Sequence, residues 1–244
     1  MTAVSQPEAL AQAYAGLTDV VAPLDDAGLR RPTRCRGWRV ADLLFHVLCD
    51  AQRALVALAS PADGPADRDD VSYWRGFAAP PDATGAGTGR RAARDDGDSG
   101  DSGDRHAGWV RRSVAAFEHP SGVFRVWADT APAAVRAAAA ADPDGFVTTQ
   151  GHVLRVPDLL ATLTTEAVVH HLDLIVDLPD APPPAALPAR VAVASLCGLL
   201  SDDAVRPAGW DDRDFLLRAT GRVPLTDRDR WELGEAAGWF PLIG

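Results

Sequence analysis

One apolar stretch in the second half of the chain constrains the fold most, because it carries ionisable residues at helical spacing. Residues 157–178 read PDLLATLTTEAVVHHLDLIVDL, and Leu159 and Leu163 recur at an interval that places them on one side of a helix. Glu166 and His170 fall on the same side, four residues apart. Burying a carboxylate and an imidazole is costly unless they pair or bind a metal. We therefore expect a core helix that carries a polar site.

A second helical run, residues 40–60, contributes another polar residue. Leucines fall on two faces of VADLLFHVLCDAQRALVAL, which indicates a helix buried on more than one side, and His46 lies on one of these faces. Two imidazoles and one carboxylate form a zinc-type donor set with an open coordination position. We therefore predict His46, Glu166 and His170 as metal ligands. The alternative to a metal site is that His46 is an ordinary core histidine and that Glu166 and His170 form a surface pair, which would stabilise the helix by about 0.2–0.5 kcal/mol.

Other segments complete a helical bundle. Residues 7–24 follow a hydroxyl cap at Ser5 and repeat apolar residues at spacings of three and four. Residues 106–118 and 123–141 are two further helical pieces, and FVTTQGHVLRV predicts a hairpin that turns at Gly151. The outline predicts a mainly α fold built on an up-down four-helix bundle, an architecture that places metal sites on facing helices.

The bundle is expected to be interrupted once and followed by a second domain. Residues 61–105 are rich in Gly, Ser and Asp and predict a mobile loop, in which VSYWRGF (71–77) is an apolar island. The proline-rich PDAPPPAALP then separates a bundle domain, 1–180, from a small α+β domain, 181–244. That second domain contains a strand candidate at 214–221.

Charge and cysteine content exclude several classes of protein. The net charge is −10 without a Lys/Arg cluster, which argues against nucleic-acid binding. Three cysteines without a C-x-x-C pair are typical of a reducing compartment. No signal peptide is apparent, and no stretch reaches the roughly 20 apolar residues that span a bilayer. We expect a cytoplasmic monomer or homodimer without membrane partners.

Three sequence motifs resemble one known family. PTRCRGWRVADLLFHVL (32–48) resembles a Cys-x-Gly-Trp-x-x-x-Asp-Leu-x-x-His pattern, and LLATLTTEAVVHHLDL (159–174) resembles a Glu-x-x-x-His-x-x-Asp pattern. The ending LRATGRVPLTDRDRWELG…FPL (217–242) is also similar to the tail of many relatives. Together they resemble the DinB/YfiT-like four-helix bundle superfamily and, more closely, the mycothiol-dependent maleylpyruvate isomerase family of actinobacteria.

This resemblance implies a metal, a thiol and a reaction class. The ligand positions of the family fall on His46, Glu166 and His170, the metal is a divalent ion, usually zinc, and the thiol is mycothiol. Asp173 matches the last position of the helical motif, and we expect it to hydrogen-bond a ligand rather than the ion. A metal-bound thiol loses its proton at neutral pH, which suits an isomerase or a transferase acting on a small, possibly dicarboxylate, electrophile.

Two arginines in the tail, Arg218 and Arg222, are candidates for binding substrate carboxylates, since the guanidinium fork matches them. Asp42 and Asp50, each one turn from His46, are further candidates for hydrogen-bonding it, with a solvated face as the alternative. The three histidines outside the two motif helices carry no signal; they are His106, His119 and His152.

The sequence departs from the family pattern at three places. His171 stands where a small residue is usual, Arg39 replaces a capping hydroxyl, and the 61–105 loop is unusually long. Helix geometry turns His171 about 100° away from its neighbour His170, so we expect packing rather than ligation there. Two alternatives to an enzyme remain: a metal-binding sensor or accessory protein without catalysis, and a metal-free bundle recruited to a biosynthetic pathway.

Overall fold

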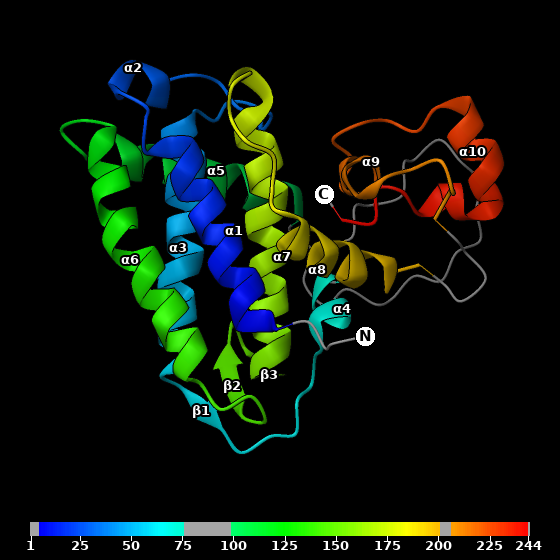
Figure 1. The fold of residues 1–244 in the computed structure, drawn as a ribbon, viewed down its shortest axis with the longest axis horizontal. Helices are drawn as coiled ribbons and strands as arrows, with labels where there is room; N and C mark the ends of the chain where they lie inside the picture. The colour runs from blue at the N-terminus through cyan, green and yellow to red at the C-terminus, as the bar shows by residue number, and fades with distance from the viewer. Residues whose placement is uncertain (1–4, 76–98, 201–205, 244) are drawn as a thin grey trace.

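The computed structural model describes residues 5–75, 99–200 and 206–243, with the backbone alone for 99–104. Four long helices stand side by side in the left part of Figure 1: α1 (Gln6–Val21), α3 (Val40–Leu58), α6 (Ser121–Ala140) and α7 (Val156–Leu174). Each packs on two of the others: α1 and α3 both contact α6 and α7. The predictions of a mainly α fold and a helical bundle are confirmed.

The helix that carries the motif Glu-x-x-x-His, α7, is the most deeply buried of the four bundle helices. Nearly every residue of α7 is buried, and Pro157 in its first turn suits a helix start. By length and composition the stretch Val156–Asp177, mean hydropathy 1.3, is long and apolar enough to cross a membrane, so the expectation that no stretch reaches this limit was wrong. Its apolar window is 83% buried inside the protein, which is what a core helix requires.

Capping hydrogen bonds and buried side chains explain where the other bundle helices begin and which faces they bury. The Ser5 hydroxyl accepts from the backbone N–H of Glu8 at the start of α1, as predicted. At the start of α3, the Asp42 carboxylate accepts from the backbone N–H of Arg39 at 2.9 Å, so its role is capping. Trp127 of α6 is fully buried and its indole donates to Thr18 at 2.9 Å.

A small antiparallel sheet closes one end of the bundle. β2 (Phe146–Thr149) and β3 (His152–Arg155) form the predicted hairpin, and β1 (Pro61–Ala62) pairs with the other edge of β2. The turn between them needs positive φ at both central residues, 48° at Gln150 and 80° at Gly151. The hairpin leads directly into α7 and therefore fixes where that helix starts.

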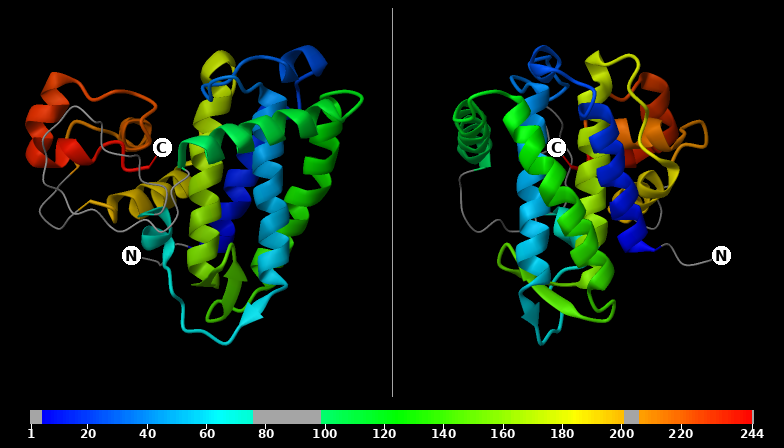
Figure 2. Two further views of the ribbon diagram at one scale, coloured as in Figure 1. Left: turned by 180° about the vertical axis from the view of Figure 1, so that it is seen from behind. Right: turned by 60° about the vertical axis from the view of Figure 1, so that its left-hand side comes forward.

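Residues 63–69 form neither helix nor strand, but the rest of the described part of 61–105 does, so the loop prediction is wrong there. Besides β1, the segment contains α4 (Asp70–Trp74), whose Trp74 is buried at 5% exposure and accounts for the apolar island. Helix α5 (Ser99–Ala115) begins before the predicted residue 106. Seen from behind, it runs across the upright helices (Figure 2). Residues 76–98 lie outside the described residues. The composition of this segment shows low helix propensity, but it does not show the tertiary contacts that hold α4 and α5 in helical form.

The described residues after 178 form helices and no strand, so the strand prediction for 214–221 was wrong. They comprise α8 (Ala186–Cys197), α9 (Asp212–Ala219), α10 (Asp227–Leu233) and η3 (Gly234–Trp239). The Asp211 carboxylate caps α9 at the N–H of Asp214, 2.7 Å, and Phe215 and Leu216 bury together against the neighbouring helices. This cap and packing favour a helix over an extended strand. Two short turns complete the elements, α2 (Asp26–Leu29) and η2 (Ile175–Asp177).

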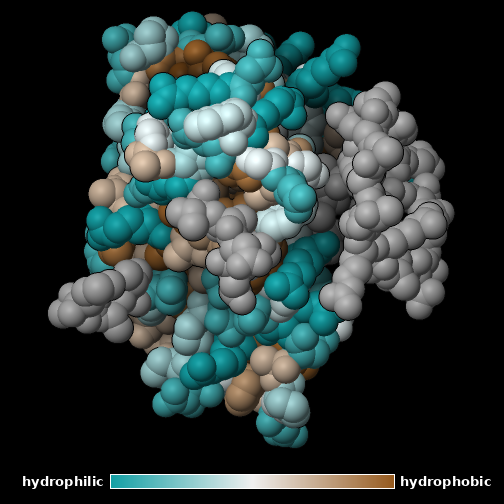
Figure 3. All heavy atoms as spheres, turned by 90° about the vertical axis from the view of Figure 1, so that its right-hand side faces the viewer, coloured by the Kyte–Doolittle hydropathy of each residue, from teal (hydrophilic) through white to brown (hydrophobic). Residues whose placement is uncertain are grey.

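Two main apolar clusters lie inside the molecule. The larger fills the bundle, and the smaller joins Val168 and Leu172 of α7 to the C-terminal helices, so α7 belongs to both. On the side that carries these C-terminal helices, hydrophilic residues cover much of the described surface and apolar residues form small separate areas (Figure 3). The predicted division at residue 180 stays a prediction.

Candidate metal centre

The three predicted ligand residues lie together between α3 and α7. His46 comes from α3, and Glu166 and His170 come from successive turns of α7. The Glu166 Oε1 atom is 3.4 Å from His46 Nε2 and 3.8 Å from His170 Nε2, and one ligand atom of each residue lies within 4.8 Å of the other two. Ligands at zinc distances sit about 3.3 Å apart around a tetrahedron. Two imidazole nitrogens and one carboxylate oxygen at these separations fit a divalent ion.

Charge and burial couple these residues. Burial alone raises the pKa of a carboxyl, but the His46 ring and then the charge of His170 hold the pKa of Glu166 well below its usual range. Conversely, burial lowers the pKa of His46, while its contact with Glu166 and the nearby charge of Asp50 outweigh this and raise the pKa. The Glu166 carboxylate therefore stays ionised and supplies the negative charge among the three predicted ligands.

A second carboxylate, Asp50, lies on the α3 side of the cluster. It is 5% exposed, and its Oδ2 is 3.8 Å from His46 Nε2. Its Oδ1 accepts from the Arg53 guanidinium at 2.6 Å, whereas Oδ2 has no hydrogen-bond partner among the described residues. Burial and the charge of Glu166 raise the pKa of Asp50 to about 6. Of the two aspartates flanking His46, Asp50 faces the site and Asp42 caps the helix.

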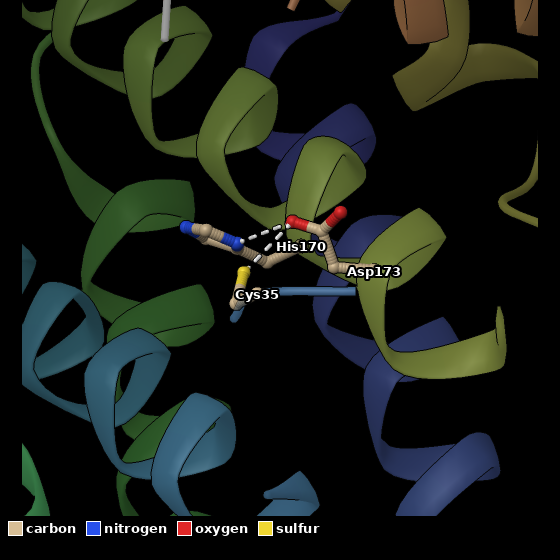
Figure 4. A group of neighbouring side chains, drawn as sticks. All are labelled: Cys35, His170 and Asp173. Atoms are coloured by element: carbon tan, nitrogen blue, oxygen red, sulfur yellow. Dashed lines mark hydrogen bonds and ion pairs between the residues drawn. The ribbon is translucent and has the colours of Figure 1, made fainter. Parts of the chain in front are cut away.

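Asp173 anchors the other side of His170 (Figure 4). Its Oδ2 is 3.1 Å from His170 Nδ1 and accepts from the Cys35 thiol at 3.3 Å. This carboxylate has no exposed surface, and burial would raise its pKa, but the contacts with His170 and with Arg222 hold the pKa far below the usual range. Burial and the neighbouring Asp173 carboxylate raise the pKa of the Cys35 thiol to about 12, so Cys35 stays a protonated donor. The Nδ1 contact leaves Nε2 of His170 facing Glu166.

The two tail arginines differ in position. Arg222 bonds both carboxylate oxygens of Asp173, with Nε 2.9 Å from Oδ1 and NH2 2.9 Å from Oδ2. Arg218 instead pairs with Asp214 and Asp229 and lies over the Trp210 ring. The structure thus brings Arg222 next to the cluster but not Arg218. Both guanidiniums have carboxylate partners within the chain, and a substrate-binding role for either stays a prediction.

Two other histidines have contrasting settings. His171 is 2% exposed and its Nε2 lies 2.9 Å from the carbonyl oxygen of Pro182, so it packs away from the cluster as helix geometry predicts. His106 of α5 was not among the predicted site residues, yet its Nε2 lies 3.3 Å from His46 Nδ1. Trp38 packs on the His46 ring with centroids 5.3 Å apart. His106 and Trp109 are three residues apart and share a face of α5, but this spacing is also common in a surface helix and does not by itself indicate a site.

A cavity of about 530 Å³ opens beside the cluster, a size typical of small-molecule sites. His46 and Glu166 form one part of its wall. The remaining lining residues come from α3, α4, α5, the hairpin and α7: Asp50, Arg53, Tyr73, Trp74, His106, Thr149, Gln150, Leu159, Thr162 and Leu163. His46 and Glu166 therefore border a space large enough for a small organic molecule.

A comparison with known families matches residues 10–175 to the mycothiol maleylpyruvate isomerase N-terminal domain. The chain belongs to this family. No curated protein and no solved structure matches the chain. Membership of the mycothiol maleylpyruvate isomerase family associates the protein with mycothiol and with isomerase-like chemistry on a small molecule.

The family match covers the whole candidate centre. His46, Glu166, His170 and Asp173 all fall within residues 10–175, as do the cavity-lining residues. Arg218 and Arg222 lie beyond the matched region. The family domain thus corresponds to the bundle, and the helices from α8 onward lie outside it.

Proposed function

We propose that the protein binds a divalent ion, zinc, through His46, Glu166 and His170, and that it uses mycothiol to isomerise or conjugate a small electrophile. The observation that carries this proposal is the convergence of three donor atoms within 4.8 Å beside a cavity of about 530 Å³. Family membership supplies the thiol. Neither the metal nor the substrate follows from family membership alone.

In this mechanism the chain orients donors and shields the reacting groups. Asp173 accepts the Nδ1–H of His170, which leaves its Nε2 lone pair toward Glu166. A bound divalent ion supplies positive charge that lowers the pKa of a coordinated thiol to near or below neutrality. The cavity wall holds the electrophile next to the thiol sulfur and limits water, while Arg53 offers it a positive charge. Whether the adduct reverts to an isomer or leaves as a conjugate depends on the substrate.

Metal analysis tests the first half of the proposal. Protein purified without chelators should contain about one equivalent of zinc or another divalent ion per chain, and His170→Ala should abolish it because one of the three donors is lost. His119→Ala is the matched control, since His119 contacts Asp26 at 3.5 Å, away from the centre. A wild-type chain that takes up no divalent ion, even after reconstitution, contradicts the proposal.

Thiol-dependent turnover tests the second half. The metal-loaded protein should isomerise or conjugate small electrophiles, dicarboxylates included, only when mycothiol is present, and the product identifies which reaction occurs. Stoichiometric metal without thiol-dependent turnover over a broad electrophile panel favours the alternative, a metal-binding sensor or accessory protein. The proposal places the protein in the cytoplasm of an actinobacterium, as a monomer or homodimer, and light scattering decides between these two states.

A further inference from the structure

Helix α5 crosses the bundle next to the candidate centre, and its sequence favours the helical state only weakly. Its sequence, SGDSGDRHAGWVRRSVA, contains three glycines and few apolar residues, so its intrinsic helix propensity is low. Its main neighbour among the described elements is α3. There Val110 is fully buried, and Trp109 packs on Phe45 with ring centroids 5.6 Å apart. Tertiary contacts such as these therefore contribute much of the stability of α5.

One of the contacts between α5 and α3 is polar and involves His46, a predicted metal ligand. His106 Nε2 lies 3.3 Å from His46 Nδ1, and the two rings meet nearly edge to face at 78°. The other ring nitrogen of His46, Nε2, is the atom 3.4 Å from Glu166. His46 thus presents one nitrogen to the centre and the other to α5, and Trp38 covers its ring.

The chemistry of imidazole gives this contact a direction. A neutral histidine that offers the lone pair of Nε2 to an ion carries its proton on Nδ1. That Nδ1–H needs an acceptor, and ligand histidines in metal sites usually have one. We propose that His106 is a positioning residue that accepts the Nδ1–H of His46, so that metal binding at the centre and docking of α5 stabilise each other. This inference rests on the proposed metal site.

Reciprocity makes the inference measurable in two ways. If the docked α5 favours the metal-binding form of His46, a bound ion must favour the docked α5 by the same factor. Loss of such a hydrogen-bond partner typically weakens metal binding about 10–100-fold. Backbone amides of α5 exchange their hydrogens when the helix opens locally. Zinc binding is therefore expected to slow this exchange by the same factor.

The first experiment needs no variant. Hydrogen exchange of the full wild-type chain is followed with and without saturating Zn²⁺. We expect exchange of the amides of α5 to slow about tenfold or more on zinc binding. If zinc binds tightly and the exchange of α5 does not change, the inference is overturned while the proposed metal site stands. If zinc does not bind at all, the proposed function fails and the inference fails with it.

The second experiment separates the hydrogen bond from ring packing. His106→Phe keeps an aromatic ring beside Trp109 and removes the acceptor, whereas His106→Gln keeps an acceptor. His119→Phe removes a histidine away from the centre and is the matched control. Zn²⁺ affinity, measured by competition with a chromophoric chelator, should fall about tenfold or more in His106→Phe. It should stay within about threefold of wild type in His106→Gln and in the control. A His106→Phe chain that folds, as judged by circular dichroism, and binds zinc as tightly as wild type overturns the inference.

Discussion

Arg222→Met should destabilise the protein strongly, because it leaves a buried carboxylate with too few partners. In the folded chain the Arg222 guanidinium donates to both oxygens of Asp173 at 2.9 Å. Only 18% of the arginine side chain and 1% of the aspartate side chain are exposed. After the substitution, Asp173 keeps the contacts with His170 and Cys35, and the Arg34 guanidinium lies at 3.9 Å.

The size of the effect follows from burial. Removing one partner of a buried ion pair costs about 3–5 kcal/mol, and the remaining contacts place this case near the lower end, about 3 kcal/mol. For a chain of this length 1 kcal/mol corresponds to about 2–4 °C in Tm, so we expect a decrease of about 6–12 °C. A surface ion pair would give about 0–1 kcal/mol instead.

The effect has a predicted pH dependence. The pKa of Asp173 in the folded chain is lowered, with the unfolded value near 3.9. Its contribution to stability is therefore fully present above about pH 5 and is lost as the pH falls below the unfolded pKa toward the folded value. The difference in stability between wild type and Arg222→Met should be full at pH 7 and smaller at pH 3.5.

Urea unfolding of metal-free protein at the two pH values measures this difference, with m-values compared to verify two-state behaviour. Arg228→Met is the control, because Arg228 is 84% exposed and pairs with Glu232 at the surface. A loss below about 1 kcal/mol at pH 7, or an equal loss at both pH values, would refute the reasoning that the Asp173 charge is buried and paired.

Three further substitutions test other parts of the structure. Asp50→Asn in metal-free protein should raise the free energy of unfolding by about 1–3 kcal/mol at pH 8, because the pKa of Asp50 is raised to about 6 and its ionised form is costly above that pH. Urea unfolding should show a smaller increase in the free energy of unfolding at pH 4.5. Gly151→Ala should cost about 1 kcal/mol in the same assay although no atom lies within 4 Å of the new methyl group, because φ is +80°; no loss would contradict the turn geometry. Trp127→Ala should cost about 3–5 kcal/mol by thermal unfolding, since the indole is fully buried, and a loss below 1 kcal/mol would contradict that packing.

Local sequence signals predicted those parts of the fold that depend on neighbouring residues. The Ser5 cap and the turn at Gln150 and Gly151 were both readable, because each needs only a few adjacent residues. The strand prediction for 214–221 failed because a short apolar run suits either a strand or a buried helix. Packing against α8 and the Asp211 cap decided between them.

The same distinction applies to the candidate centre. Periodicity placed Glu166 and His170 on one face of α7 and His46 on an apolar face of α3, and the family motif added Asp173, so the sequence predicted which residues gather at the centre. It did not determine what surrounds them. Arg222 reaches Asp173 across 49 positions of the chain, and His106 reaches His46 across 60.

Those contacts depend on how α5 and the tail dock onto the bundle, and docking is a sum of weak interactions between residues far apart in sequence. No local pattern encodes such a sum. The sequence by itself therefore determined the four long bundle helices, their buried faces and the three candidate ligand residues, whose identities follow from residue type and spacing. Only the tertiary structure decided which nitrogen of His46 faces the centre, which carboxylate is paired, and where the cavity opens.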